Sequence, residues 1–262
     1  MIPPPPPAPA RDPTQMARAA PALEASASDR AVRRARPARW VSDAGGQGHD
    51  GHVTLVQPTL SLWDEPPVPF RERVVADAND RVGWLRARAR GVTATDAAQL
   101  ASSQSVAALA MTKLLGTNFG GNAFTQHGRD REPAIAKWAH SVYGMNANTL
   151  LFHADGAREH LATPDGWREK GEALELCEIK TTTSVWKAIP RAYLRQVWWQ
   201  QYVLGAERTL VVWERHDNFV PVHADPECRW VDRDDNEIHR LRVLADELMH
   251  AMRRGRPTRP SV

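Results

Sequence analysis

Two acidic residues and a lysine stand near the middle of the sequence in an order that suits hydrolytic chemistry. Asp165 lies in a Thr-Pro-Asp-Gly segment, and a Leu-Cys-Glu-Ile-Lys segment then brings Glu178 and Lys180. On a β-strand Glu178 and Lys180 share one face at a spacing of about 7 Å, while Cys177 and Ile179 point to the other face. The strand therefore presents a carboxylate and an ammonium group side by side, and Cys177 is interpreted as a core residue without a redox role.

If Asp165 meets Glu178, their carboxylates and the backbone carbonyl of Ile179 form an oxygen-rich pocket. Such a pocket suits Mg²⁺ or Mn²⁺, hard cations that bind oxygen and keep several waters. Lys180 would then orient an attacking water and favour its hydroxide form, as phosphodiester hydrolysis requires. The spacing alone is also compatible with an exposed strand that carries an ion pair.

The composition excludes several classes of protein. No stretch approaches the roughly 18 apolar residues of a transmembrane helix, and the first residues lack the pattern of a secretory signal. Only Cys177 and Cys228 are present, so a disulfide framework is not expected and one chain cannot supply a four-cysteine iron–sulfur site. We therefore expect a protein of the host or bacterial cytoplasm with no membrane association.

Positive charge is concentrated at the N-terminus. Residues 1–39 contain seven arginines and three acidic residues, a charge of +4, so the other 223 residues carry about −1 of the total of +3. We expect residues 1–52 to form a disordered Ala/Pro/Arg-rich tail and linker, residues 53–76 an irregular lead-in, and residues 77–262 the folded domain. The tail is either dispensable or an arginine-bearing arm that contacts nucleic acid.

The remaining patterns indicate the elements that would position these residues. They predict a mixed α/β fold in which strands and helices alternate. Thr95 is the expected N-cap of one helix, and Pro133 is expected in the first turn of another that begins at Glu132 and ends at Gly144. The predicted helices are 77–90, 96 onward, 132–143, 191–204 and 236–253, and the predicted strands are 53–56, 149–153, 174–180 and 210–213.

Five motifs occur in order between about residues 80 and 213: Trp84 to Asp96 with Arg88 and Thr95, Gly128 to Pro133, Thr163 to Gly166, Glu178 to Lys180, and Tyr193 to Val197. Five ordered motifs are far more specific than any one of them. Together they resemble the YqaJ-like viral recombinase family, the phage lambda exonuclease family of the PD-(D/E)xK nuclease superfamily. The resemblance implies a central mixed β-sheet flanked by helices.

The resemblance also implies roles for individual residues. Asp165 and Glu178 would bind the metal with the Ile179 carbonyl, Glu132 would complete the site, and Lys180 would assist the attacking water. Arg88 and Thr95 match the family's pair for a terminal 5′ phosphate, and Tyr193 and Gln196 match residues beside the active site. Read without the family, Glu132 is equally an acid that complements a helix N-terminus.

The implied function is a Mg²⁺- or Mn²⁺-dependent deoxyribonuclease, a 5′-to-3′ exonuclease on double-stranded DNA that acts in phage-type homologous recombination. Its implied partners are double-stranded DNA ends, a single-strand annealing protein and further copies of itself, as a homo-oligomer such as a trimer. The alternatives are an endonuclease or single-strand exonuclease on the same core, and a DNA-end-binding protein without turnover.

Overall fold

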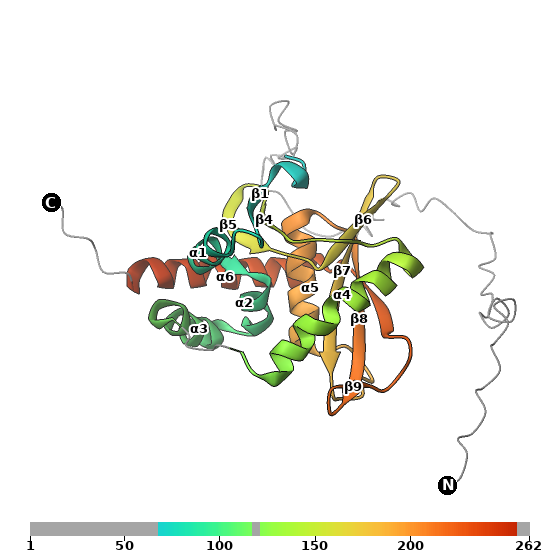
Figure 1. The fold of residues 1–262 in the computed structure, drawn as a ribbon. Helices are drawn as coiled ribbons and strands as arrows, with labels where there is room; N and C mark the ends of the chain where they lie inside the picture. Colours follow the sequence, from blue (N-terminus) through green and yellow to red (C-terminus); the bar gives the residue numbers. More distant parts are fainter. Residues whose placement is uncertain (1–67, 117–120, 256–262) are drawn as a thin grey trace, which may run out of the picture. The chain divides into compact units, whose positions relative to one another are not determined.

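The computed structural model describes residues 68–116 and 121–255 (Figure 1). The predicted tail and the strand expected at residues 53–56 lie outside these ranges. Strand β1 (Val74–Asp77) pairs antiparallel with β4 (Leu150–Ala154), so the described part of the predicted lead-in already contributes to a sheet. None of the helices in the described ranges is long and apolar enough to cross a membrane.

Two β-sheets form the framework. In the smaller sheet the strand order is β1-β4-β5-β2, where β5 is Ala157–Ala162 and β2 is Val92–Thr93. In the larger sheet the order is β10-β8-β7-β6-β3, and β9 (Val220–Pro221) pairs with the end of β8. These strands are β10 (Glu227–Asp232), β8 (Arg208–Asp217), β7 (Ala173–Thr182), β6 (Gly166–Lys170) and β3 (Asn146–Ala147).

Strands β7 and β8 run parallel, whereas the other neighbours in the larger sheet run antiparallel. The helices are α1 (Arg81–Arg90), α2 (Ala94–Gln99), α3 (Ser103–Leu115), α4 (Ala123–Tyr143), α5 (Arg191–Leu204) and α6 (Asp235–Gly255). Helix α5 lies between the two sheets, and α4 covers the opposite face of the larger sheet (Figure 1). The predicted mixed sheet flanked by helices is therefore confirmed.

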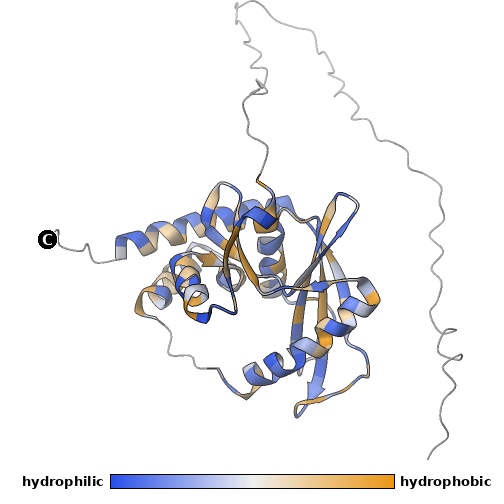
Figure 2. Cartoon of the chain, turned by 45° about the horizontal axis from the view of Figure 1, so that its top comes forward, coloured by the Kyte–Doolittle hydropathy of each residue, from blue (hydrophilic) through white to orange (hydrophobic). Residues whose placement is uncertain are grey.

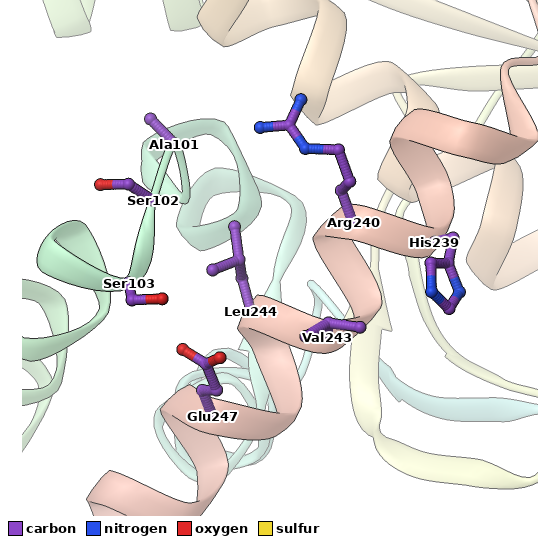
Figure 3. Close-up of a pocket in the computed structure, with 8 residues that line it drawn as sticks. All are labelled: Ala101, Ser102, Ser103, His239, Arg240, Val243, Leu244 and Glu247. Carbon is purple, nitrogen blue, oxygen red and sulfur yellow. The ribbon is translucent and has the colours of Figure 1, made fainter.

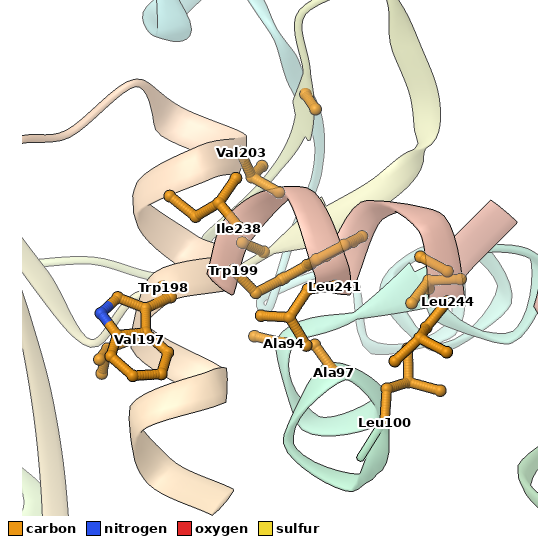
Figure 4. Close-up of a cluster of buried hydrophobic side chains, with 14 of the residues drawn as sticks. Ala94, Ala97, Leu100, Val197, Trp198, Trp199, Val203, Ile238, Leu241 and Leu244 are labelled. Atoms are coloured by element: carbon orange, nitrogen blue, oxygen red, sulfur yellow. The ribbon is translucent and has the colours of Figure 1, made fainter. Parts of the chain in front are cut away.

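The main core forms where α2, α5 and α6 meet, around the fully buried Trp199 (Figure 4). Strand β7 alternates between two cores: Leu174 and Leu176 pack in the main core, while Cys177 and Ile179 pack beneath α4. Hydrophobic residues accordingly run along the central strands, and hydrophilic residues cover much of α4 and α6 (Figure 2). The predicted alternation of β7 is confirmed.

Two helix starts near the predicted phosphate residues differ from expectation. Helix α1 begins at Arg81, because the Asp80 side chain caps it by accepting the N–H of Gly83. Helix α2 is capped by Thr93, whose side chain and backbone N–H pair reciprocally with Asp96. Thr95 is therefore a first-turn residue and not the N-cap.

Helix α4 begins at Ala123, nine residues before the predicted start. Asn122 caps it by accepting the N–H of Thr125, and Gly144 ends it in the left-handed conformation, with a φ of 70°. Pro133 thus lies inside the helix, where it removes one backbone hydrogen bond. The helix is continuous because the stripe that contains the buried Ile135 and Ala139 packs on the sheet. Placing Glu132 at a helix start was therefore wrong.

Candidate active site

The candidate site forms at an edge of β7 that lacks a strand partner in the described structure. Strand β6 pairs with β7 only as far as Cys177, whereas β8 follows the other edge of β7 to Thr182. Beyond Cys177, the β6-side edge of β7 is therefore free of ladder hydrogen bonds. Because the N–H and C=O of one strand residue point to the same edge, the carbonyl of Ile179 faces this open side.

Asp165 lies where the open part of this edge begins, immediately before β6. Its backbone N–H donates to the carbonyl of Cys177, and its Oδ2 accepts the N–H of Ile179 at 2.6 Å. The side chain thus takes the place of the next strand residue in the ladder. Burial and the negative charges of Glu178 and Glu132 raise the pKa of Asp165 well above its usual value, although Lys180 opposes this effect.

Glu178 is 1% exposed, and its carboxylate accepts hydrogen bonds from three side-chain donors. Gln200 donates to its Oε2 at 2.6 Å, while Gln196 and Lys180 donate to its Oε1. Both glutamines lie on α5, which crosses the face of the sheet that Glu178 occupies. These two glutamines are the support that fixes the carboxylate.

Lys180 stays charged in a partly buried position. Burial alone lowers the pKa of its ammonium, but the adjacent Glu178 and Asp165 carboxylates outweigh that effect and raise it. Its Nζ also lies 5.2 Å from the ring centre of Tyr193, on α5. The electron-rich ring adds a second attraction for the cation. Tyr193, Gln196, Glu178 and Lys180 are thus brought together as predicted.

Glu132 approaches this group from α4. It helps to line a cavity of about 400 Å³ together with Ile179, Lys180 and Thr181, and the rest of the lining comes from the first turns of α4. Burial and the charge of Glu178 raise the pKa of Glu132, while Lys180 lowers it. Glu132 therefore shares one electrostatic environment with Asp165 and Glu178, and the cavity gives that environment access to solvent.

The donor set fits a hard divalent cation in its chemistry. The negative charge of Glu178 raises the pKa of both Asp165 and Glu132, the single lysine opposes this effect, and a dication would offset the repulsion among the acids. Carboxylate and carbonyl oxygens are also the ligands that Mg²⁺ and Mn²⁺ prefer. Within residues 68–116 and 121–255, however, no three His, Cys, Asp or Glu side chains converge as a finished metal cage.

The two residues predicted to bind a terminal phosphate, Arg88 and Thr95, lie together at a second site, on α1 and α2. An Arg88 Nη lies 3.5 Å from the hydroxyl of Thr95, and the guanidinium lies 4.2 Å from the ring centre of Trp84. Burial lowers the pKa of Arg88, whereas nearby Asp96 raises it. Thr95 is exposed, so a guanidinium fork and a hydroxyl meet at the first turn of a helix, where anions are favoured.

Sequence reasoning missed two residues that support the site at β7. Gln200 binds the remaining oxygen of Glu178, and its position one turn after Gln196 was the signal that could have revealed this role. Arg131 of α4 forms a two-pronged ion pair with the buried Glu214 of β8 and so anchors the helix that carries Glu132. No local pattern connects residues 131 and 214, because only the sheet brings them together.

Comparison with known proteins assigns the fold. An alkaline exonuclease (LHK-Exo) from Laribacter hongkongensis superposes with a TM-score of 0.52 at 24% identity, over 65% of this chain and 92% of that one. The same enzyme in complex with dAMP gives a TM-score of 0.50 at 21% identity over the same shares. A phage-related exonuclease from Haemophilus somnus 129PT gives 0.50 at 13% identity, over 63% of this chain and 94% of that one.

The fold is thus similar to that of these exonucleases, and in this chain the acidic residues and Lys180 lie at an edge of β7 in the larger sheet. Residues 83–207 match the profile of the YqaJ-like viral recombinase domain. No protein of curated function matches the sequence. The matched segment begins in α1, before Arg88, and ends just beyond α5, after Gln200.

Proposed function

We propose that this protein is a divalent-metal-dependent DNA nuclease whose reaction centre lies at the open edge of β7. The observation that carries the proposal is the support of Glu178. Gln196 and Gln200 hold its carboxylate while Lys180 binds it, beside a cavity that Glu132 also lines. Three donors fix the carboxylate of Glu178 close to two further acids. Such a group of acids is suited to hold a metal cation next to a phosphate.

In this proposal Asp165, Glu178, Glu132 and the Ile179 carbonyl hold Mg²⁺ or Mn²⁺. The bound ion would polarise the scissile phosphate and stabilise the leaving oxygen. Lys180 keeps its proton and directs a water toward the phosphorus while it offsets negative charge on the phosphate oxygens. Gln196 and Gln200 maintain the orientation of Glu178, and the Tyr193 ring helps to hold the lysine.

The finer proposal is a 5′-to-3′ exonuclease on double-stranded DNA ends. Its support is the pair of Arg88 and Thr95, which offers donors for a terminal phosphate on elements separate from the reaction centre. A phosphate held there would set the end of the strand at a fixed distance from Glu178. We further propose action in phage-type recombination in the cytoplasm, as a homo-oligomer such as a trimer, alongside a single-strand annealing protein.

The test is a time course on linear duplex DNA labelled at one end, with Mg²⁺, with Mn²⁺ or with EDTA. We expect mononucleotides to appear from 5′-phosphorylated ends when a metal is present, and no products in EDTA. Internal fragments would instead identify an endonuclease, digestion of single strands alone a single-strand exonuclease, and DNA binding without products an end-binding protein.

The phosphate role is tested by Arg88→Ala, with Arg86→Ala as the matched control because Arg86 is an exposed arginine of the same helix. We expect Arg88→Ala to remove most of the preference for 5′-phosphorylated over 5′-hydroxyl ends, a loss of about tenfold or more for a charge-assisted fork. A preference that survives Arg88→Ala unchanged would contradict this role.

A further inference from the structure

A positively charged pocket, separate from the candidate active site, lies on the side of α5 that faces α6. It is a cavity of about 160 Å³ between the end of α2, the beginning of α5 and the beginning of α6. Among the residues that the structure describes, three arginines, Arg191, Arg195 and Arg240, and one acidic residue, Glu237, line it. We call this cavity the arginine pocket.

The charges in the arginine pocket do not balance. Arg191 and Arg240 both bind Glu237, at 3.0 and 3.1 Å, so one carboxylate is shared by two guanidinium groups. Arg195 instead donates twice to the backbone carbonyl of Ala98, which carries no net charge. Three positive charges therefore face one negative charge. Burial and the positive charge of Arg191 lower the pKa of Arg195, as expected for an excess of cations.

The beginning of α5 adds to this excess. The positive end of a helix dipole favours acidic residues, but the first turn of α5 contains none and instead begins with Arg191. Pro190 occupies the N-cap position and provides no side-chain acceptor. The sequence thus places cations where the helix itself already favours an anion, an arrangement that an external anion would stabilise.

The arginine pocket opens beside a wider groove of about 510 Å³ between α6 and the loop before α3. Arg240 and Leu244 line both cavities, and Figure 3 shows Arg240 extending from α6 in the direction of Ala101. The side chains of Arg191 and Arg240 are 62% and 59% exposed. Their unused N–H groups are therefore accessible to a ligand larger than a single ion.

We propose that the arginine pocket binds a backbone phosphate of the DNA substrate, at a point separate from the terminal phosphate. The inference rests on the proposed nuclease function. Helix α5 carries Tyr193, whose ring contacts Lys180 of the reaction centre, and in sequence Tyr193 lies between Arg191 and Arg195 of the pocket. Helix α2 carries Thr95, and Ala98, which binds Arg195, follows about 4.5 Å further along its axis. The two helices connect the arginine pocket to both proposed substrate contacts.

The experiment measures binding without cleavage. The full chain is titrated against a fluorescently labelled 5′-phosphorylated duplex in EDTA, by anisotropy at several salt concentrations. The test variant is Arg191→Gln with Arg240→Gln, and Arg253→Gln is the matched control, an exposed ion-paired arginine near the other end of α6. We expect the double variant to bind about five- to tenfold more weakly, with the slope of log K against log salt reduced by about one to two.

A third variant separates attraction by the pocket from loss of structure. Glu237→Gln removes the single acid of the arginine pocket and should tighten duplex binding. Binding by the double variant that equals binding by Arg253→Gln, or weaker binding by Glu237→Gln, would overturn the inference. A labelled polyglutamate peptide serves as a second probe. If the double variant lost binding to this peptide but kept its binding to the duplex, the inference would also be overturned, because the pocket would then bind an acidic protein segment. Absence of duplex binding by the unaltered protein would instead contradict the proposed function itself.

Discussion

Strand β7 buries two glutamates three residues apart, and their surroundings differ in charge. Glu175 is 3% exposed and binds Arg168 and Arg208, at 2.5 Å in each case. Burial alone raises the pKa of Glu175, but the hydrogen bonds and charges of the two arginines outweigh this effect and lower it. One acid is matched here by two cations, an arrangement that stabilises the folded state.

Glu178 is buried to the same degree, yet its surroundings hold more acids than cations. Lys180 is its only cationic hydrogen-bond partner in the described structure, and the other two donors are the neutral amides of Gln196 and Gln200. Asp165 and Glu132 add negative charge nearby. The comparison teaches that burial and hydrogen bonding do not by themselves mark a functional acid. In the proposed function, it is the excess of negative charge around Glu178 that leaves a role for a metal ion or substrate.

The largest effect on stability is expected from replacing Glu175. Glu175→Gln should lower the free energy of unfolding by about 3 kcal/mol, because it leaves two partly buried arginines without their acid. Urea denaturation followed by circular dichroism measures this change. An effect below about 1 kcal/mol would show that Glu175 is not the structural member of the pair.

At the other end of β7, Lys180→Ala should reduce the rate of DNA hydrolysis by about 10²- to 10³-fold, the usual loss when one group that stabilises the transition state is removed. Duplex binding should change little by comparison. Lys170→Ala is the control, since Lys170 is an exposed lysine at the end of β6. Normal turnover by Lys180→Ala would contradict the proposed centre.

The smallest expected effect on stability belongs to Asp165→Asn, which keeps an acceptor for the N–H of Ile179. Because the folded-state pKa of Asp165 is raised, its ionised form opposes folding, and stability is lost as pH rises through that pKa. At pH 8 the variant should therefore match the unaltered protein or exceed it by about 1 kcal/mol.

Metal addition distinguishes the two forms of residue 165. Mg²⁺ or Mn²⁺ should raise the melting temperature of the unaltered protein, because a ligand that binds only the folded state stabilises it, and Asp165→Asn should show little of this shift. Thermal unfolding with and without each metal provides the measurement. Equal shifts in both proteins would remove Asp165 from the proposed metal ligands.

The sequence predicted elements well where one pattern dominated. Helix α5 has the predicted bounds, and β7 and β8 extend the strands expected from their apolar runs. The helix that carries Glu132 was predicted too short, because Pro133 was interpreted as a start signal while packing on the sheet kept the helix continuous through it. Helix α3 was not predicted, since its small, weakly amphipathic residues give no clear periodicity.

The sequence by itself determined which side chains β7 presents together, because the period of two places Glu178 and Lys180 on one face and Ile179 on the other. It also determined that Tyr193 and Gln196 lie on one helix, predicted over residues 191–204. Only the tertiary structure decided that β6 begins at Gly166, the partner of Cys177, and so leaves an open edge on β7. It also decided that α5 and α4 approach β7 from opposite faces. Spacing fixes local direction through backbone geometry, whereas partners distant in sequence are fixed by the packing of whole elements.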